Sequence, residues 1–404
     1  MRGGTVRAVN RMTARWAAAL PPGAGTVLSA AGVWPLLAPL ADGAAGAARA
    51  ELADALGLPA EEAAGAAREL AAGLGAIPGV ASATGLWARA DLPLRDSWVA
   101  GLPDAALGRL TGDPEADRKT LDTWAAERTG GLVPALPVAL DEETPFVLAS
   151  AQTVRTAWTE PFWSRTTRMA SGPWSGRRVM WLHRSTPALD DAALAETEAG
   201  PLTVLRVRGD TGVDVHLLLG EPAAASGAVL RAGIDVLEGR APAVPGDRLP
   251  AGSPGPGLEV RTVRRTTPDP RLVASVPAFA LSAGHDLLAH HGLFGLTTAR
   301  DTGHGHFPGV ADAPLAIGQG RQAATAEFTA RGFEAATATA FGAVGAGAPP
   351  SPYTVRIVVV ELDRPFGFLA VHRASGLVLT AGWVALPDSR EAAAGSRRPP
   401  LTRS

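Results

Sequence analysis

Hydrophobic residues in the first third of the chain recur every three or four positions, which is the period of an amphipathic helix. The last helix predicted from this spacing ends at the Gly130–Gly131 pair, because glycine commonly follows a helix C-terminus. Two runs typical of β-strands interleave with the helices, at Val80–Trp87 and Phe146–Thr156. The predicted helices are Val6–Leu20, Gly32–Leu40, Ala44–Leu56, Ala60–Leu74 and Arg118–Arg128.

From Leu202 onward the pattern changes to alternation and to runs of β-branched residues. One helix, Ser282–His291, is predicted to interrupt these strands, and Ala241–Pro256 is predicted to be a Pro/Gly loop. Helices early and antiparallel strands late indicate an α+β fold. The predicted strands are Leu202–Val207, Val213–Leu219, Leu258–Thr262, Leu272–Phe279, Val355–Leu362, Phe366–Val371 and Leu377–Val384.

The segment Gly332–Pro352 (GFEAATATAFGAVGAGAPPSP) combines a run of small, β-compatible residues with a Gly/Ala/Pro-rich stretch. Such composition is typical of linkers. A linker here would leave only about 35 ordered residues beyond it, too few to fold alone without disulfides. The closing strands must therefore pair with earlier ones. We expect one domain over residues 1–388, crossed by a loop at 332–352, and a disordered tail at 389–404.

Composition narrows the possible functions. The formal net charge of the 404 residues is −2, so nothing in the charge favours nucleic acid or an anionic membrane as a partner. Cysteine is absent, which excludes disulfides and thiol chemistry. The N-terminal residues lack the pattern of a signal peptide, and Pro and Gly interrupt every apolar stretch. A cytoplasmic protein is expected, with non-standard export as the alternative.

Motifs of the common enzyme classes are missing from the sequence. There is no G-x-S-x-G, no P-loop around Lys119 and no H-E-x-x-H. Gly318, Gly320 and Ala323 fit a dinucleotide pattern, but the βαβ frame that this pattern needs is not predicted. We expect no enzyme and no cofactor. Four histidines could be imagined as metal ligands, but a lone H-x-H in a Gly-rich turn is more often a solvated loop, so no metal is expected. These are His290, His291, His304 and His306.

Several segments, in order, resemble those of the serpins, the serine protease inhibitor family. Pro145–Phe162 resembles the central strand of the serpin main sheet, and Gly332–Phe341 resembles the hinge of the serpin reactive-centre loop. The likeness extends from about Val6 to Pro387 and identifies the chain as a bacterial-type member. It implies a helical N-terminal half around a large mixed main sheet, with smaller antiparallel sheets and an exposed reactive-centre loop. The other matching segments are Leu28–Leu56, Asp122–Pro137, Phe307–Val310, Arg364–Phe368 and Gly376–Val384.

The resemblance also assigns polar positions that hold the main sheet closed. Trp158 matches the tryptophan of the breach, at the top of the sheet, while Ser150 and Gln322 match the shutter, near its middle. Ser150 stands where serpins usually carry Asn, and Gln322 where they carry His. Ser and Gln can both still form hydrogen bonds. Two further departures are Gly32, in place of Ser, and Ala330, in place of Glu.

The implied hinge should enter the main sheet as a strand of period two once the loop is cut. Its first residue after Gly332 is Phe333, where inhibitors carry Thr or Ser, so we expect this large side chain to slow entry. Counting forward from Gly332 along the family's spacing places the reactive bond at Ala346–Gly347, whereas counting backward from Pro365 places it near Thr354–Val355. The implied hinge residues are Gly332, Phe333, Glu334, Ala335, Ala336, Thr337, Ala338 and Thr339.

Two functions follow from the resemblance. The first is a monomeric inhibitor that a serine protease cuts and that then traps the acyl-enzyme. The second is a non-inhibitory protein of the same fold that acts by binding or as a protease substrate. No Lys or Arg lies between Arg331 and Arg356, which favours an elastase- or subtilisin-like protease. The acidic Ala60–Leu74 segment argues against heparin as a cofactor.

Overall fold

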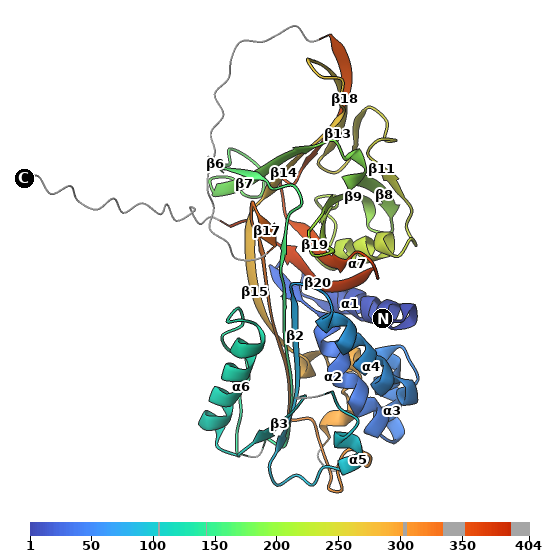
Figure 1. Cartoon of the computed structure of the whole chain (residues 1–404), viewed down its shortest axis with the longest axis vertical. Helices are drawn as coiled ribbons and strands as arrows, with labels where there is room; N and C mark the ends of the chain where they lie inside the picture. Colours follow the sequence, from blue (N-terminus) through green and yellow to red (C-terminus); the bar gives the residue numbers. More distant parts are fainter. Residues whose placement is uncertain (104–105, 143, 302–304, 334–351, 389–404) are drawn as a thin grey trace, which may run out of the picture.

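The computed structural model describes the chain except residues 104–105, 143, 302–304, 334–351 and 389–404. A large mixed sheet runs down the middle of Figure 1 and forms the frame of the molecule. Its central strands β4 (Phe146–Val154) and β16 (Gln319–Phe328) pair in parallel. On the outer side of β4 lie β2 (Val80–Arg89) and β3 (Leu107–Leu110), and on the outer side of β16 lies β15 (Phe279–Asp286).

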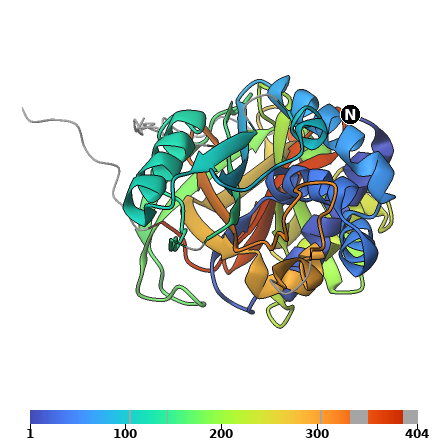
Figure 2. The same cartoon turned by 90° about the horizontal axis from the view of Figure 1, so that it is seen from below.

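Every residue of β4 is buried, because helices cover both faces of the main sheet. Phe146, Leu148 and Val154 belong to the main hydrophobic core, whereas Val147 and Ala149 belong to a smaller cluster on the other face. Figure 2 shows α6 on the opposite side of the sheet from α2, α3 and α4. The helices are α1 (Gly3–Ala19), α2 (Ala30–Gly43), α3 (Gly46–Leu56), α4 (Ala60–Gly75), α5 (Asp96–Val99), α6 (Pro114–Arg128), α7 (Ser226–Leu237) and α8 (His291–Phe294).

Two further sheets pack next to the main sheet. In the first, the strands are β1 (Thr26–Leu28), β20 (Leu377–Val384), β19 (Phe366–His372), β10 (Val213–Leu219), β9 (Gly200–Val207), β8 (Ala192–Thr197) and β11 (Ala243–Pro245), in that order. In the second, they are β12 (Gly252–Gly255), β13 (Leu258–Arg265), β18 (Tyr353–Glu361), β14 (Arg271–Pro277), β7 (Arg178–Thr186) and β6 (Trp163–Arg168).

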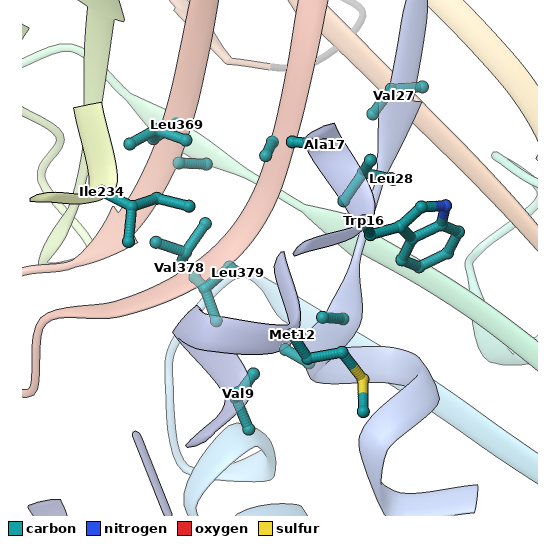
Figure 3. Close-up of a cluster of buried hydrophobic side chains, with 14 of the residues drawn as sticks. Val9, Met12, Trp16, Ala17, Val27, Leu28, Ile234, Leu369, Val378 and Leu379 are labelled. Atoms are coloured by element: carbon teal, nitrogen blue, oxygen red, sulfur yellow. The ribbon is translucent and has the colours of Figure 1, made fainter. Parts of the chain in front are cut away.

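Helix α1 joins the helical layer to the sheet of β19 and β20. Figure 3 shows Val9, Met12 and Trp16 of α1 close to Leu28 and to Val378 and Leu379 of β20, and all of these side chains are buried. The core therefore combines residues from the first and the last thirty or so described positions. That arrangement explains why the N-terminal helix and the closing strands both need the complete fold to bury their apolar faces.

The structure confirms that the closing strands pair with strands formed earlier in the chain. Strand β18 lies between β13 and β14, β19 pairs with β10, and β20 pairs with β1. The α+β class and the large mixed sheet are also confirmed. None of the helices in the described part of the chain is long and apolar enough to span a bilayer.

One predicted helix is wrong. Ser282–His291 begins inside strand β15, which pairs with β16 from Phe279 to Asp286, and only short helical turns follow. The spacing of Ala283, Leu287 and Leu288 imitated a helix, but the pairing with β16 outweighs that local pattern. The predicted Ala241–Pro256 loop contains the short strands β11 and β12. Helix α7 and strands β6, β7 and β8 were not predicted at all.

Candidate functional site: the slot at the top of the main sheet

The segment that follows β16 turns back into the main sheet. Strand β17 (Gly332–Phe333) pairs antiparallel with Phe328 of β16 on one side and with β5 (Thr156–Ala157) on the other. Below this point β4 and β16 pair directly, up to Gln152 and Ala324. The two central strands are therefore separated at the top by the width of one strand. We call this space, bounded by β5 and Phe328, the slot.

A tight turn sends the chain from β16 into the slot. The backbone N–H of Thr329 donates to the carbonyl of Gly332 (2.9 Å), and the Thr329 hydroxyl also donates to this carbonyl (3.1 Å). The N–H groups of Arg331 and Gly332 in turn donate to the Thr329 hydroxyl, each at 3.3 Å. This single threonine thus closes the turn, and sequence reasoning did not identify it.

Phe333 lies inside the slot with its ring buried. Only 1% of its surface is exposed, and its ring centroid lies 5.8 Å from that of Phe368 on β19. Phe328 and Phe279 stack nearby, 5.4 Å apart. We call the whole group the aromatic cluster: Trp158, Phe162, Phe279, Phe328, Phe333, Phe366 and Phe368.

The position of Phe333 changes what the sequence led us to expect. The sequence led us to expect slow insertion, on the assumption that the Phe333 side chain lies outside the sheet before cleavage and must enter it. In the structure the ring is already buried and packs on Phe368 of β19, which in turn contacts Phe279 of β15. Any later extension of β17 would begin with Glu334, so the size of Phe333 imposes no entry cost on that step.

Trp158, which the resemblance assigns to the breach, bonds the top of the sheet next to the slot. Its backbone N–H donates to the carbonyl of Arg331 (2.8 Å), and its indole Nε1 donates to the carbonyl of Thr329 (2.9 Å). Its ring packs on Phe328, with the centroids 4.7 Å apart. Next to it, the N–H of Phe162 donates to the carbonyl of Ala330 (2.8 Å). The residues just before the hinge are therefore bonded to the chain that follows β5.

Gln322 forms a two-point clamp in the middle of the sheet. Its Oε1 accepts from the backbone N–H of Ser29 (2.8 Å), and its Nε2 donates to the carbonyl of the same residue (2.7 Å). Both residues are fully buried. Because Ser29 is the N-cap of α2, the clamp ties β16 to the start of the helix that packs beneath the sheet.

Two further residues extend this network, and sequence reasoning missed both. The Ser29 hydroxyl lies 2.8 Å from Gln152 Oε1 and 2.6 Å from the carbonyl of Leu379 on β20. Gln152 Nε2 also donates to Leu379 (3.1 Å). A polar Gln inside a fully buried strand, and a Ser immediately before a predicted helix, were the two signals that could have identified them. We call Ser29, Gln152 and Gln322 the shutter network.

Ser150 lies beside the shutter network without joining it. Its hydroxyl is buried and has no hydrogen-bond partner among the described residues. Gly32 of α2 faces this hydroxyl, and a Cβ added at Gly32 would lie 2.5 Å from Ser150 Oγ. The hydroxyl thus fills the space that a side chain at residue 32 would need, and the Gly32 and Ser150 departures accommodate one another.

His285 borders the shutter network on β15, opposite Gln322. Its Nε2 lies 2.8 Å from the carbonyl of Val27. Burial lowers the pKa of His285, and the hydrogen bond to Val27 opposes this only in part. The imidazole is therefore neutral near pH 7 and serves as a hydrogen-bonding group that connects β15 to β1.

Several predicted site residues lie outside the described part of the chain. These are the hinge residues Glu334, Ala335, Ala336, Thr337, Ala338 and Thr339, and the reactive-bond residues Ala346 and Gly347. Among the described residues, no group of three or more His, Asp or Glu side chains gathers as metal ligands do. His291 instead contacts Thr297 (2.9 Å), and His306 pairs with Asp301 (3.3 Å).

We predict that Gln322→Ala lowers the free energy of unfolding by about 2–4 kcal/mol, because the buried N–H of Ser29 loses its partner and the Ser29 carbonyl keeps only the N–H of Gly32. Ser150→Ala is the matched control. It lies on the neighbouring strand at the same depth and breaks no hydrogen bond, so it should leave stability unchanged or slightly raised. Urea unfolding measures both. Equal effects of the two changes would contradict the clamp.

The comparisons with known proteins agree with this geometry. Residues 9–171 match the family model described as serpin (serine protease inhibitor). Serpin-Z6C of Oryza sativa subsp. japonica is 28% identical over 425 aligned positions, which cover 93% of this chain and 95% of the plant protein. The bacterial-type assignment stays a prediction.

Two solved structures share the fold. Human thyroxine-binding globulin, complexed with thyroxine, superposes with a TM-score of 0.71 at 16% identity and covers 95% of this chain and 98% of its own. Serpin48 of the insect Tenebrio molitor superposes with a TM-score of 0.68 at 19% identity, with 95% and 98% covered. The matching family model, the plant relative aligned over most of the chain, and a mixed main sheet closed by β4 and β16 together support the serpin superfamily for this chain.

Proposed function

We propose that this protein inhibits a serine protease by being cut within residues 332–352, forming an acyl-enzyme and inserting the cut segment into the main sheet. The observation that carries this proposal is the placement of Gly332–Phe333. The strand runs antiparallel to both of its neighbours, β5 and β16. It points along the boundary between β4 and β16, so its continuation would lie between these two strands.

The strand directions supply a driving force. Strands β4 and β16 run parallel, so one strand between them would replace a single parallel ladder with two antiparallel ladders. Antiparallel pairing is slightly more stable per residue, and the number of ladders doubles. Such a sheet would store free energy in its uncut form and release it on insertion.

The sequence of the hinge suits this strand. Because Phe333 faces the aromatic cluster, the period of two assigns alternate residues to that core face and the others to the α6 face. No proline occurs between Gly332 and Pro349, so every backbone N–H from residue 334 to residue 348 can donate to a ladder. The expected core-face residues are Ala335, Thr337, Thr339 and Phe341, and those of the α6 face are Glu334, Ala336, Ala338, Ala340 and Gly342.

The anchoring of β18 explains why the segment must be cut first. A strand as long as β16, ten residues, extends about 33 Å. If residues 334–343 inserted uncut, residues 344–352 would remain to return to Tyr353, and nine residues span at most about 32 Å. Figure 1 places β18 above β17, so the return path exceeds the length of the sheet.

Strand β18 also resists being pulled away. It pairs with β13 from Tyr353 to Val360 and with β14 from Ile357 to Glu361. The Arg356 side chain additionally donates to the carbonyl of Gly246 (3.1 Å). Cutting the segment removes the connection to this strand, and the N-terminal part is then free to insert.

The chemistry at the cut is that of an ordinary serine protease. The protease serine attacks the scissile carbonyl, an ester bond to the protease forms, and the amine of the following residue leaves with β18. Water would normally hydrolyse this ester. Insertion that outpaces hydrolysis carries the attached protease to the far end of the sheet.

The pairing of β18 bears on the choice between the two bonds that counting gave. We retain Ala346–Gly347 as the reactive bond. The alternative, Thr354–Val355, lies within β18, where each residue pairs with one of β13. A protease binds its substrate as an extended single strand, so a bond already held in a ladder is a poor substrate.

A second candidate is a non-inhibitory protein that is cut without trapping, or that acts only by binding. The observation that favours it is the aromatic cluster, because Phe333 packs against Phe368 of a different sheet. A hinge held by that contact could stay where it is after cleavage. The fold likeness to thyroxine-binding globulin, which binds thyroxine, is compatible with this alternative.

We predict that cleavage between Phe341 and Ala348 raises the melting temperature sharply, because the new strand replaces one parallel ladder with two antiparallel ladders and buries apolar side chains on its core face. Cutting an ordinary loop lowers stability instead. Differential scanning calorimetry of intact and cut protein measures the change. An unchanged melting temperature would contradict insertion and favour the second candidate.

Phe333→Thr separates the two candidates further. If the ring occupies the same cluster before and after insertion, the substitution lowers the melting temperatures of intact and cut protein by similar amounts. The ratio of trapped to turned-over protease then changes little. A selective loss in the intact form, together with more trapping, would show that Phe333 acts as a brake on the hinge.

We predict an SDS-stable adduct with pancreatic elastase or subtilisin and none with trypsin through this segment. Val344, Ala346 and Ala348 suit shallow pockets for small side chains, whereas the trypsin pocket needs Lys or Arg. Gel analysis followed by sequencing of the released C-terminal fragment identifies the cut bond. A trypsin adduct formed within residues 332–352 would refute this specificity.

A further inference from the structure

The turn between β9 and β10 lies against the outer edge of β5, the strand that forms one wall of the slot. The N–H of Thr159 donates to the carbonyl of Arg208 (3.1 Å), and Trp158 forms an isolated bridge with Gly209. The N–H of Thr211 donates to the hydroxyl of Thr156 (3.4 Å). The slot wall is thus bonded on the side away from β17 as well as on the side facing it.

Asp210 makes the central contacts of this turn with β5. Its Oδ1 accepts from the N–H of Ala157 (3.0 Å) and from the hydroxyl of Thr156 (3.3 Å). Its own backbone N–H donates to the carbonyl of Ala157 (2.9 Å). Both backbone groups of Ala157 are therefore bound by Asp210. Thr156 and Ala157 are also the residues that pair with Phe333 and Gly332.

The turn that carries Asp210 is itself rigidly held. A Cβ on Gly209 would lie 2.1 Å from Thr156 Oγ1, so only glycine allows the turn to come this close to β5. The carbonyl of Gly209 accepts from Arg373 (2.8 Å), and its N–H donates to Asp214 (3.2 Å). Arg373 and Asp214 form an ion pair at 2.6 Å with the aspartate buried.

The Arg373–Asp214 pair stays ionised at neutral pH. Burial would raise the pKa of Asp214, but the hydrogen bonds from Arg373 and from the N–H of Gly209 lower it below its ordinary value. The hydrogen bond with Asp214 likewise raises the pKa of Arg373. This permanently charged pair fixes the turn, and Asp210 extends from that fixed point to β5.

We propose that Asp210 is a positioning residue that holds β5 one strand's width away from β16, so that the slot accommodates β17 before any cut. This inference rests on the proposed function and names a residue that the family resemblance did not assign. Asp210 acts through Thr156 and Ala157, which are the pairing template for the first residues of the hinge.

The consequence is kinetic. Insertion competes with hydrolysis of the acyl-enzyme, so each step that delays the strand increases turnover at the expense of trapping. A wall held in register lets residue 334 add to an existing pair, in the way that elongation of a structured segment is easier than its nucleation. If β5 were free to move, it would have to return to this position before the new strand could pair, while hydrolysis of the acyl-enzyme continued.

The test compares Asp210→Ala with Asp210→Asn. Asparagine keeps an Oδ1 acceptor for Ala157 and Thr156, whereas alanine removes it. Asp235→Ala is the control, because this aspartate lies in helix α7, outside the main sheet, and binds Arg240 (2.8 Å). The stoichiometry of inhibition of pancreatic elastase and subtilisin is measured, together with the rate at which cut protein gains thermal stability.

We expect Asp210→Ala to raise the stoichiometry of inhibition at least about threefold and to slow the gain in stability by a similar factor. Asp210→Asn and Asp235→Ala should stay within about twofold of the unmodified protein, and all intact variants should melt at similar temperatures, since Asp210 is exposed. Equal behaviour of the Ala and Asn variants, or trapping by Asp210→Ala as efficient as in the unmodified protein, overturns the positioning role.

The same data separate this inference from the proposed function. If the unmodified protein forms no adduct and gains no stability when cut, the proposed function fails, and the role of Asp210 in it fails as well. If the unmodified protein traps and inserts while Asp210→Ala is unaffected, only the positioning role fails.

Discussion

The parallel pairing of β4 and β16 is the constraint on which the rest of the structure depends. These strands span residues 146–154 and 319–328. Their direct pairing closes the main sheet, which has helices on both faces. Parallel ladders are the weaker kind, and this one ends at Gln152 and Ala324, short of the top of both strands. Above that point the sheet accepts a further strand, and Gly332–Phe333 already occupies the place.

Two sets of polar contacts hold this sheet, and they act at different heights. The shutter network ties the middle of the closed pair to the N-cap of α2 and to Leu379, so separating the strands there breaks buried hydrogen bonds. At the top, Trp158 bonds the chain after β5 to the turn that follows β16, Asp210 binds the outer side of β5, and β17 lies between β5 and β16. A sheet that is clamped in its middle and open at one end can admit a strand from that end only.

Both residues that flank the segment between β17 and β18 are held by the fold. Phe333 is fixed by the aromatic cluster, and Tyr353 begins a strand that pairs on both edges. The chain between them is held at both ends of a path that an uncut strand cannot follow without detaching β18. In the function that we propose, cleavage frees one end, and this would link protease attack to the conformational change.

The sequence by itself determined the elements whose local pattern and burial agree. The helices that cover the sheet, the fully buried strand around Ser150 and the three closing strands were predicted because apolar spacing decided them. The family resemblance added Trp158 and Gln322. Only the tertiary structure decided the conformation of Ser282–His291, because its first residues pair with β16 as a strand despite the helical spacing of their apolar residues. It alone brought Ser29, Gln152 and Asp210 to their partners, because hydrogen bonds between residues 29 and 322, or 157 and 210, depend on how distant strands meet and leave no periodic signal in the chain.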